Sequence, residues 1–435
     1  MKIQMLKDAI MNGEFDARFK RVYVTDEAVK AQHERYVSLA NDFAEIFSED
    51  RDARLFSAPG RTEVGGNHTD HNHGRVLAAG INLDAIAVAS KNDENIVRVK
   101  SRGYKMDVCD ITDLEIKEDE KGHSPALVRG MCAGFLKYGY KIGGFDAVTM
   151  SSVLSGSGLS SSAAYEVLVG TMLNYLYNDG QVDAITIAKI AQYAENVYFD
   201  KPCGLMDQMA CSVGGFVTID FNNPAEPIVN EVKYDFASSG HSLCIVDTKG
   251  SHSDLTDDYA AIRGEMEAVA GCFGKKVLRE VDEEEFKKNI PAIREKTGDR
   301  AVIRAMHFFA DNDRVLKEVD ALKNGDFETF KSYILESGDS SYKYNQNVFS
   351  VKKPLEQPVS LALAVSESIL KGKGAWRVHG GGFAGTIQAF VPNDILADYK
   401  NAMESIFGED SCYVLLIRPD GGVAIYIKVD LNDNY

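Results

Sequence analysis

The chain places Ser155-Gly156-Ser157-Gly158-Leu159-Ser160-Ser161-Ser162-Ala163-Ala164 directly before residues 165–177, whose apolar side chains recur at helical spacing. In a loop of this composition, backbone N–H groups can approach a ligand closely. The start of the helix adds unpaired N–H donors and the positive end of the helix dipole. Together these features predict a phosphate-binding loop. Because no lysine follows the second glycine, the loop is not a Walker A motif, and the sequence predicts nucleotide binding of another kind.

The composition is that of a globular protein and limits the classes of partner. The chain has 435 residues, of which 45% are hydrophobic and 26% are charged, and its formal net charge is -17. This length predicts two domains, with three as the alternative. Nucleic acids and anionic membrane surfaces need basic patches, so the charge argues against both as partners. An anionic ligand must then be held by a local device such as a helix terminus, a metal ion or a single arginine.

The sequence predicts a cytoplasmic location. Lys2, Lys7 and Asp8 interrupt the apolar residues near the start, so no signal-peptide core is expected there. The longest apolar segment, 76–89, contains Asn82 and Asp84 and is too short to span a bilayer. The seven cysteines show no CxxC spacing, which predicts reduced thiols rather than a zinc site or a disulfide framework.

Helical and strand-like segments follow one another without a regular βαβ alternation, which predicts an α+β fold. We expect helices at 26–48, 126–138, 165–177, 184–198, 205–212, 255–270, 302–320 and 359–370. We expect strands at 55–59, 76–81, 85–90, 96–100, 144–150, 216–220, 242–247, 375–378, 386–390, 412–418 and 423–428. A boundary near 236, placed to within about 20 residues, divides the chain into domains 1–236 and 237–435.

Residues 58–74, Ala-Pro-Gly-Arg-Thr-Glu-Val-Gly-Gly-Asn-His-Thr-Asp-His-Asn-His-Gly, are predicted to form a loop crowded with hydrogen-bonding groups. The spacing of His68, His71 and His73 allows a metal site as one interpretation. Zinc sites usually combine a helical H-x3-H pair or a CxxC pair, and this segment has neither. We therefore favour polar recognition of a small hydroxylated ligand.

Two carboxylates lie at positions where chemistry and ordinary helix structure are both plausible. Asp207 follows Cys203-Gly204 at an expected helix start, where a negative charge is favourable in any case. Its functional interpretation is a base or hydrogen-bond acceptor for a substrate hydroxyl. Glu195 would ordinarily be a surface residue of a helix. Beside a phosphate loop it is also the kind of hard oxygen ligand that magnesium takes.

A second glycine-rich segment, His379-Gly380-Gly381-Gly382-Phe383-Ala384-Gly385, matches the GxGxxG pattern of dinucleotide-binding enzymes. The apolar run that follows, 386–390, is predicted to be a strand rather than the helix that a Rossmann fold requires. A Rossmann dehydrogenase is thus the weaker enzyme interpretation. Close approach of the backbone to another backbone or to a ligand explains the glycines better.

In their order and spacing these segments resemble the GHMP kinases, and the first one resembles the galactokinase branch. Pro59-Gly60-Arg61 with Gly66-Asn67-His68-Thr69-Asp70 is similar to the branch signature G-R-x-N-x-I-G-E-H-T-D-Y, and Gly156–Ala164 is similar to the family's ATP loop. The resemblance covers nearly the whole chain. It implies a ribosomal S5 domain 2-like N-terminal domain, a ferredoxin-like C-terminal domain, and transfer of the ATP γ-phosphoryl group to the anomeric hydroxyl of a sugar, most simply galactose.

The resemblance also implies roles for individual residues. Arg61 and Asp207 would form the catalytic pair, and Ser161 or Ser162 with Glu195 would hold Mg²⁺. The sugar contacts fall on Asn67, His68, Asp70 and Tyr259, and the ATP contacts fall on Gly156, Ser157, Gly158, Leu159, Ser160, Ser161 and Ser162.

The signature departs from the family pattern at several positions. Glu63 and Gly65 replace its Asn and Ile, and His71 replaces its Tyr. Asn67 replaces the Glu that reaches the sugar's C6 hydroxyl in the family. Because a neutral amide can donate as well as accept, a sugar altered at C6, such as galacturonate, stays an alternative substrate beside the favoured galactose. A catalytically silent sensor of sugar and ATP is an alternative of another class. Such a protein is expected to have lost Arg61, Asp207 or the serines, all of which are present.

Overall fold

The computed structural model describes residues 1–153, 158–250 and 255–427, and in this part of the chain the strands form two sheets. Gly156 and Ser157 of the predicted ATP loop lie outside the described residues. The larger sheet has eight strands in the order β12-β1-β2-β5-β3-β4, with β6 paired to β2 and β7 paired to β6. Its strands are β1 (Arg54–Gly65), β2 (Arg75–Lys91), β3 (Ile96–Ser101), β4 (Met106–Asp110), β5 (Phe145–Ser151), β6 (Phe216–Asp220), β7 (Ile228–Val232) and β12 (Val423–Ile425).

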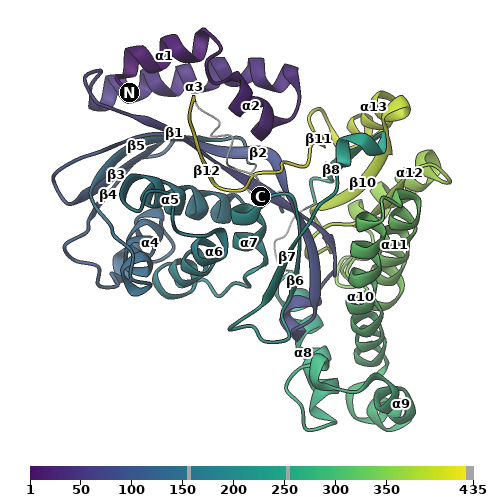
Figure 1. The fold of residues 1–435 in the computed structure, drawn as a ribbon. Coiled ribbons are helices and arrows are strands. Elements are labelled where there is room, and N and C mark those ends of the chain that lie inside the picture. Colours follow the sequence, from purple (N-terminus) through teal and green to yellow (C-terminus); the bar gives the residue numbers. More distant parts are fainter. Residues whose placement is uncertain (154–157, 251–254, 428–435) are drawn as a thin grey trace.

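Helices cover both faces of this sheet (Figure 1). On one face lie α1 (Ile3–Met11), α2 (Asp16–Tyr23) and α3 (Asp26–Phe47), whose apolar residues form one core cluster with β1, β2 and β5. On the other face lie α4 (Ser124–Lys137), α5 (Ser161–Tyr177), α6 (Ala184–Tyr193) and α7 (Met206–Val213). The start of α5 and the start of α7 therefore lie on the same side of β1.

The smaller sheet is antiparallel, in the order β11-β8-β10-β9, and contains β8 (His241–Asp247), β9 (Ala375–Val378), β10 (Thr386–Pro392) and β11 (Cys412–Leu415). One face packs against α10 (Asp299–Lys323) and α11 (Phe327–Ser340), and the other against α12 (Pro358–Leu370) and α13 (Leu396–Phe407). Helices α8 (Thr256–Gly271) and α9 (Glu283–Thr297) pack together at one end of α10. A single apolar cluster runs from the first sheet into the second, so the two sheets share a continuous core.

This arrangement confirms the predicted α+β class. The prediction of separate strands at 76–81 and 85–90 was wrong, because both belong to the single long strand β2. Polar residues in its middle are satisfied locally: Asn82 exchanges hydrogen bonds with Leu416, and the N–H of Asp84 donates to Ser152 Oγ. The predicted loop at 58–74 was wrong for residues 58–65, which continue strand β1.

The last strand does not stay with the second half of the chain. β12 pairs antiparallel with β1, with Phe56 opposite Ala424, so it completes the edge of the first sheet. The second sheet begins at β8, just after residue 236. The predicted division into 1–236 and 237–435 stays a prediction, and the pairing of β12 shows that the second half of the chain contributes one strand to the first sheet.

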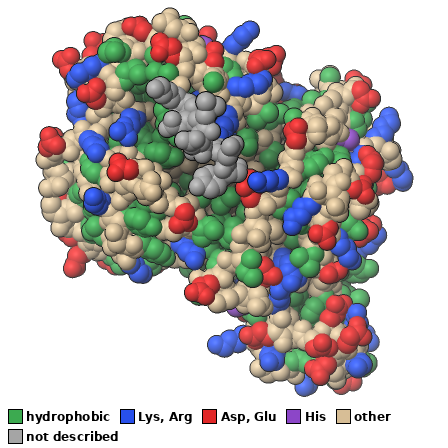
Figure 2. Space-filling view, viewed as in Figure 1, with side chains coloured by type: hydrophobic (Ala, Val, Ile, Leu, Met, Phe, Trp, Pro, Cys, Tyr) green, Lys and Arg blue, Asp and Glu red, His purple; other side chains and the backbone are tan. Residues whose placement is uncertain are grey.

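Charged side chains of both signs are interspersed on the face of the molecule shown in Figure 2. No helix in the described part of the chain is long and apolar enough to cross a bilayer.

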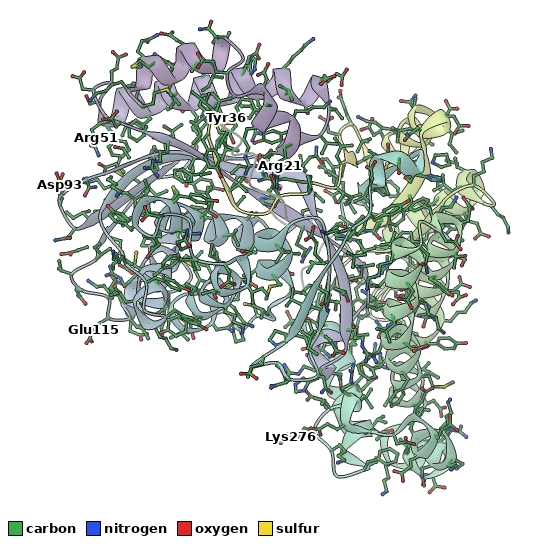
Figure 3. All side chains as sticks on the ribbon, viewed as in Figure 1. Arg21, Tyr36, Arg51, Asp93, Glu115 and Lys276 are labelled. Carbon is green, nitrogen blue, oxygen red and sulfur yellow. The ribbon has the colours of Figure 1, made fainter. Side chains whose placement is uncertain are left out.

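A fully buried carboxylate, Asp84 of β2, ties the N-terminal helices to the sheet. It accepts hydrogen bonds from Tyr23 (2.6 Å), Ser57 (2.5 Å) and Arg35 (2.9 Å), and it lies 3.3 Å from Arg418 Nη1. Tyr36 points from α3 into this cluster (Figure 3), and its hydroxyl lies 3.0 Å from that of Tyr23.

Burial would raise the pKa of the Asp84 carboxyl, but Arg35 and Arg418 outweigh burial and hold it below its usual value. Its stabilising contribution is therefore present above the unfolded-state pKa of about 3.9 and is lost as the pH falls through the lower folded-state value.

We predict that Asp84→Asn lowers the free energy of unfolding by about 3–5 kcal/mol at pH 7, because it leaves the buried Arg418 without its carboxylate. Urea unfolding followed by circular dichroism measures this loss, and the deficit should shrink in acid, below about pH 4. Asp93→Asn, at the exposed turn after β2 (Figure 3), is the matched control. Equal stability of both variants and the wild type would contradict the role given to Asp84.

Candidate active site

Three segments that are far apart in sequence meet beside the end of β1: the β1 strand itself, the start of α5 and the start of α7. The pairing of β1 with β2 shifts register at Pro59–Arg61 and again at Glu63–Gly65. Such irregularities bend a strand and redirect its side chains, and they are frequent beside active sites. Here the strand delivers Arg61 toward α7 and Glu63 toward the second sheet.

The predicted catalytic residues are in direct contact. Arg61 is buried, and it donates to Asp207 Oδ1 through Nε at 2.9 Å, with Nη2 2.8 Å from the same oxygen. Its third nitrogen, Nη1, donates to the carbonyl of Gly158, and its backbone N–H donates to the carbonyl of Leu159. Burial alone lowers the pKa of an arginine, but the Asp207 carboxylate outweighs burial and raises the pKa of Arg61. Arg61 is therefore a fixed positive charge whose side chain is largely shielded from water.

The second oxygen of Asp207 is held by the serine loop. Ser160 has a left-handed backbone conformation (φ 62°) and directly precedes α5, and its hydroxyl donates to Asp207 Oδ2 at 2.5 Å. Asp207 is the second residue of α7, where the helix dipole stabilises a negative charge. Its side chain keeps 36% of its surface exposed, in contrast to the 9% of Arg61, so the carboxylate is the member of the pair that a ligand can reach.

Glu195 lies in a short π-helical turn, η3 (Ala194–Tyr198), that continues α6. Single π-helical turns of this kind are frequently found at functional sites. The Glu195 carboxylate is buried and faces the start of α5: Oε1 lies 3.5 Å from Ser162 Oγ and 2.7 Å from Lys201 Nζ. Oε2 accepts a hydrogen bond from Gln208, next to Asp207, at 2.6 Å.

The oxygens of Ser162 and Glu195 fit a magnesium ion by chemistry. Magnesium takes hard oxygen ligands, usually one or two from protein carboxylates, with water and substrate phosphates for the rest. The hydroxyl and the carboxylate face each other across 3.5 Å at a helix start, which is where phosphates are expected. Ser161 lies in the first turn of the same helix. The described residues contain no group of three or more His, Cys, Asp or Glu that could hold a metal ion. Water and substrate phosphates would therefore have to supply the other ligands of the magnesium ion.

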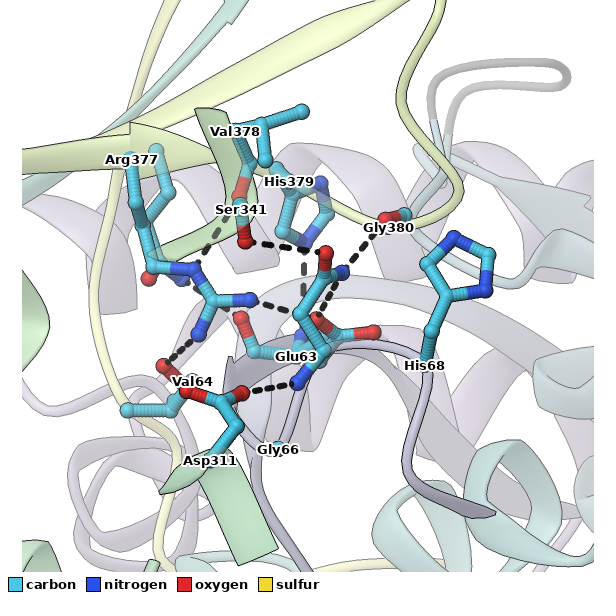
Figure 4. Close-up of polar contacts among 12 residues, drawn as sticks. Glu63, Val64, Gly66, His68, Asp311, Ser341, Arg377, Val378, His379 and Gly380 are labelled. Atoms are coloured by element: carbon cyan, nitrogen blue, oxygen red, sulfur yellow. Dashed lines mark hydrogen bonds and ion pairs between the residues drawn. The ribbon is translucent and has the colours of Figure 1, made fainter. Parts of the chain in front are cut away.

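Asn67 is buried, and protein groups occupy its entire amide. Three of its partners, Glu63, Ser341 and Gly380, are labelled in Figure 4. Nδ2 donates to Glu63 Oε1 (2.9 Å) and to the carbonyl of Gly380 (2.8 Å). Oδ1 accepts from the Ser341 hydroxyl (3.1 Å) and from Asn347 Nδ2 (2.9 Å). Because an amide side chain has two donor and two acceptor sites, none is left for a ligand. The predicted contact between Asn67 and a sugar stays a prediction, and in this arrangement the side chain instead links β1 to the second half of the chain.

Glu63 lies at the centre of the same network. Its carboxylate is 2.6 Å from Arg377 Nη2 of β9, and Arg377 also donates to the carbonyl of Val64 at 2.5 Å. Both side chains are buried. Burial raises the pKa of Glu63 to about 6 against the attraction of Arg377, so the pair is ionised at neutral pH. The ion pair joins the two sheets two residues beyond Arg61.

Gly65 is required by packing at the same junction. A side chain there would begin 1.8 Å from Glu318 Oε2 of α10. The buried Glu318 carboxyl thus occupies the space that the larger residue of the family signature would need.

His68 and Tyr259 contact the C-terminal glycine segment. His68 donates through Nε2 to the carbonyl of Gly381 at 2.9 Å, and burial lowers its pKa to about 4, so the ring is neutral. Tyr259 of α8 donates to the carbonyl of Gly382 at 2.9 Å, and burial raises its pKa to about 12. Burial, and to a smaller extent the negative charge of Asp207, raise the pKa of the Asp70 carboxyl.

The glycine segment is followed by a strand, β10, as predicted, which removes the basis of the Rossmann interpretation. A side chain on Gly382 would begin 1.9 Å from the carbonyl of Asn347, so close backbone approach explains this glycine. The preceding His379 is buried between the two halves, with Nε2 3.1 Å from Thr62 Oγ1.

Sequence reasoning missed several residues of this network. Their common property is that they are polar, buried and distant in sequence from the signature: Asp311, Ser341, Asn347 and Arg377. A charged residue between Trp376 and Val378 in an apolar strand was the one available signal for Arg377. Asp311, whose carboxylate accepts from the backbone N–H of Asn67 at 2.8 Å, lies in an amphipathic helix and gave none.

Two family models match the chain. One, the galactokinase galactose-binding signature, matches residues 41–91, and the other, the GHMP kinases N terminal domain, matches residues 126–215. A galactokinase of Glaesserella parasuis is 31% identical over 345 residues, covering 78% of this chain and 85% of the relative. A galactokinase of Clostridium beijerinckii is 30% identical over 397 residues, covering 87% and 96%.

Solved structures share the architecture. The galactokinase of Lactococcus lactis, complexed with galactose, superposes with a TM-score of 0.73 at 24% identity, over 88% of this chain and 98% of its own. A mevalonate kinase superposes with a TM-score of 0.60 at 13% identity, over 84% and 99%. These likenesses confirm the predicted two-domain GHMP kinase fold.

We predict that Asn67→Asp destabilises the protein in a pH-dependent way. The new carboxyl would lie within hydrogen-bonding distance of Glu63, and two such carboxylates cannot both be ionised. The folded state would therefore hold an extra proton, and stability relative to wild type should fall as the pH rises from 5.5 to 7.5, to a loss of about 3 kcal/mol. Urea unfolding at both pH values measures this difference.

Asn67→Ala is the control for the preceding prediction, because it removes the hydrogen bonds without adding a charge. Its loss should depend much less on pH. If Asn67→Asp were as stable as the wild type at both pH values, residue 67 would have to face water rather than Glu63.

Proposed function

Because this chain belongs to the galactokinases, within the GHMP kinases, we propose that it transfers the γ-phosphoryl group of ATP to the anomeric hydroxyl of galactose. The observation that carries this proposal is the contact between buried Arg61 and Asp207, with Ser160 at the start of α5 holding the same carboxylate. That contact places a carboxylate acceptor and a fixed positive charge beside a helix start able to bind phosphate.

In the proposed mechanism, Asp207 accepts or orients the proton of the anomeric hydroxyl. Its exposed oxygen surface lets a hydroxyl approach, and its salt bridge with Arg61 holds the carboxylate in place. Arg61 also places positive charge where negative charge develops on the transferred phosphoryl group. In phosphoryl transfer, positioning and electrostatic stabilisation supply most of the rate enhancement.

We propose that Ser162 and Glu195 hold Mg²⁺, with Ser161 as the alternative hydroxyl. When bound, magnesium would neutralise charge on the ATP phosphates. The described residues contribute the orientation: Gln208 fixes one oxygen of Glu195, and Lys201 holds the other at 2.7 Å. Lys201 thus keeps the buried carboxylate of Glu195 in place.

The acceptor sugar is proposed to bind between Asp70, His68 and Tyr259. The Nε2–H group of the neutral His68 ring donates to the carbonyl of Gly381, so Nδ1 is available to accept a hydrogen bond from a sugar hydroxyl. Asp70 offers a carboxyl oxygen next to Gly204, where a side chain would begin 3.2 Å from Asp70 Oδ2. Because Gly204, three residues before Asp207, has no side chain, the space beside the Asp70 carboxyl stays open for the sugar.

This geometry does not support the alternative of a catalytically silent sensor, because Ser160 and Arg61 are both present and both contact Asp207.

A cytoplasmic location stays a prediction. The proposed activity is tested by incubating the protein with Mg-ATP and a panel of hexoses, and by following the sugar 1-phosphate by phosphorus NMR. Galactose 1-phosphate is the expected product. Hydrolysis of ATP without a phosphorylated sugar would contradict the proposal.

We predict that Asp207→Asn lowers kcat for galactose by about 10²–10⁴-fold, because the amide cannot accept the proton of the anomeric hydroxyl. Equilibrium ATP binding, measured by calorimetry, should stay close to wild type. The control is Asp179→Asn, an exposed carboxylate in a turn whose left-handed backbone suits asparagine. Turnover of Asp207→Asn near the wild-type rate would show that another group accepts the proton.

We predict that Glu195→Gln raises the Mg²⁺ concentration needed for half-maximal activity by roughly tenfold or more, because an amide oxygen replaces a carboxylate ligand. A titration of activity with Mg²⁺ at saturating ATP measures the shift. Glu226→Gln, on an exposed loop, serves as the control. An unchanged Mg²⁺ requirement in Glu195→Gln would remove Glu195 from the metal site.

A further inference from the structure

A cavity of about 370 Å³ is lined by Asp70, one of the sugar-binding residues proposed above, and by Gly204. His71, His73 and Arg263 line the same cavity. The roles proposed above do not use these three residues. Their shared property is that each brings ring or guanidinium nitrogens to the lining of one cavity.

The proton of His71 can be placed from its neighbours. Asn72 Oδ1 accepts from the backbone N–H of Leu278 at 3.0 Å, which fixes the orientation of the Asn72 amide. Asn72 Nδ2 then faces His71 Nδ1 at 2.9 Å, so this ring nitrogen is the acceptor. In the neutral ring the proton is therefore on Nε2. That buried donor has no hydrogen-bond partner among the described residues, which is uncommon for a buried polar group.

The other two residues also have donors to spare. Arg263 of α8 donates through Nε to Glu267 on the same helix at 2.7 Å, and its remaining nitrogens make no hydrogen bond within the described residues. The side chain is 63% exposed. His73 has a left-handed backbone (φ 61°), and none of the hydrogen bonds of the described residues uses its ring.

Because these three side chains offer hydrogen-bond donors, they favour a negatively charged ligand group. Asp70 is the one acidic residue among those that line the cavity. A sugar hydroxyl is best met by a donor and an acceptor together, whereas a carboxylate or sulfate only accepts. The guanidinium fork of arginine matches such groups in two parallel hydrogen bonds. Asp70 would repel an anion, which favours placement of the anion near Arg263.

We propose that the part of this cavity lined by His71, His73 and Arg263 is a subsite for an anionic substituent of the acceptor sugar, a carboxylate or a sulfate ester, bound by these three residues. This inference rests on the proposed function, because it assumes that the reacting hydroxyl faces Asp207. The amide of Asn67 is fully occupied by protein partners, so we no longer assign recognition of a C6-altered sugar to it. We assign that recognition to His71, His73 and Arg263, whose side chains have donors without a hydrogen-bond partner among the described residues.

The test measures kcat/KM with Mg-ATP for galactose, galacturonate, galactose 6-sulfate and N-acetylgalactosamine. The first anionic sugar tests a carboxylate and the second a sulfate, and the N-acetyl sugar is a bulky neutral control. The wild type should phosphorylate at least one anionic sugar. In Arg263→Gln, the ratio of kcat/KM for that sugar to kcat/KM for galactose should fall about tenfold or more, as expected for losing a charge-assisted hydrogen bond.

Two further variants keep the test sharp. His73→Asn suits the left-handed backbone and should lower the same ratio, and Arg294→Gln, exposed on α9, should leave it unchanged. Phosphorylation of galactose together with failure on both anionic sugars would overturn the subsite. An unchanged ratio in Arg263→Gln would overturn it as well. If no sugar is phosphorylated, the proposed function fails separately, and calorimetric binding of galacturonate to wild type and Arg263→Gln then decides the subsite alone.

Discussion

The buried ion pair between Glu63 and Arg377 is the contact on which the arrangement of the two sheets depends. Glu63 belongs to β1 of the first sheet and Arg377 to β9 of the second, and neither side chain is open to water. Removing both charges from water is costly, and the cost is offset only when the remaining hydrogen-bonding groups are satisfied. Here Asn67 and the carbonyl of Val64 satisfy them. The chain therefore tolerates one relative position of the two sheets.

This constraint reaches the proposed catalytic pair, Arg61 and Asp207, through covalent geometry. Arg61 precedes Glu63 by two residues on the same irregular strand, so the strand that is anchored to the second sheet also carries Arg61. Asp207 is fixed independently, by the start of α7 and by Ser160. The two members of the pair thus come from rigid elements with separate anchors, and such an arrangement holds a catalytic contact within narrow limits.

Residues that lie inside compact motifs could be predicted from the sequence. Arg61, Asp207 and the serines were expected to act together because their motifs resemble those of the GHMP kinases, and in the described part of the chain Asp207 contacts both Arg61 and Ser160. The environment of Asn67 could not be predicted. Its partners Ser341 and Asn347 are more than 270 residues away, and no local pattern indicates which buried amides will meet.

The return of β12 to the first sheet has a consequence for how the molecule is made. Because residues 423–425 supply the strand beside β1, the edge that supports the signature stays open while the second half of the chain is being synthesised. During translation, domains usually fold in order of synthesis. In this protein, completion of the first sheet waits until residues 423–425 have been synthesised, after all four strands of the second sheet.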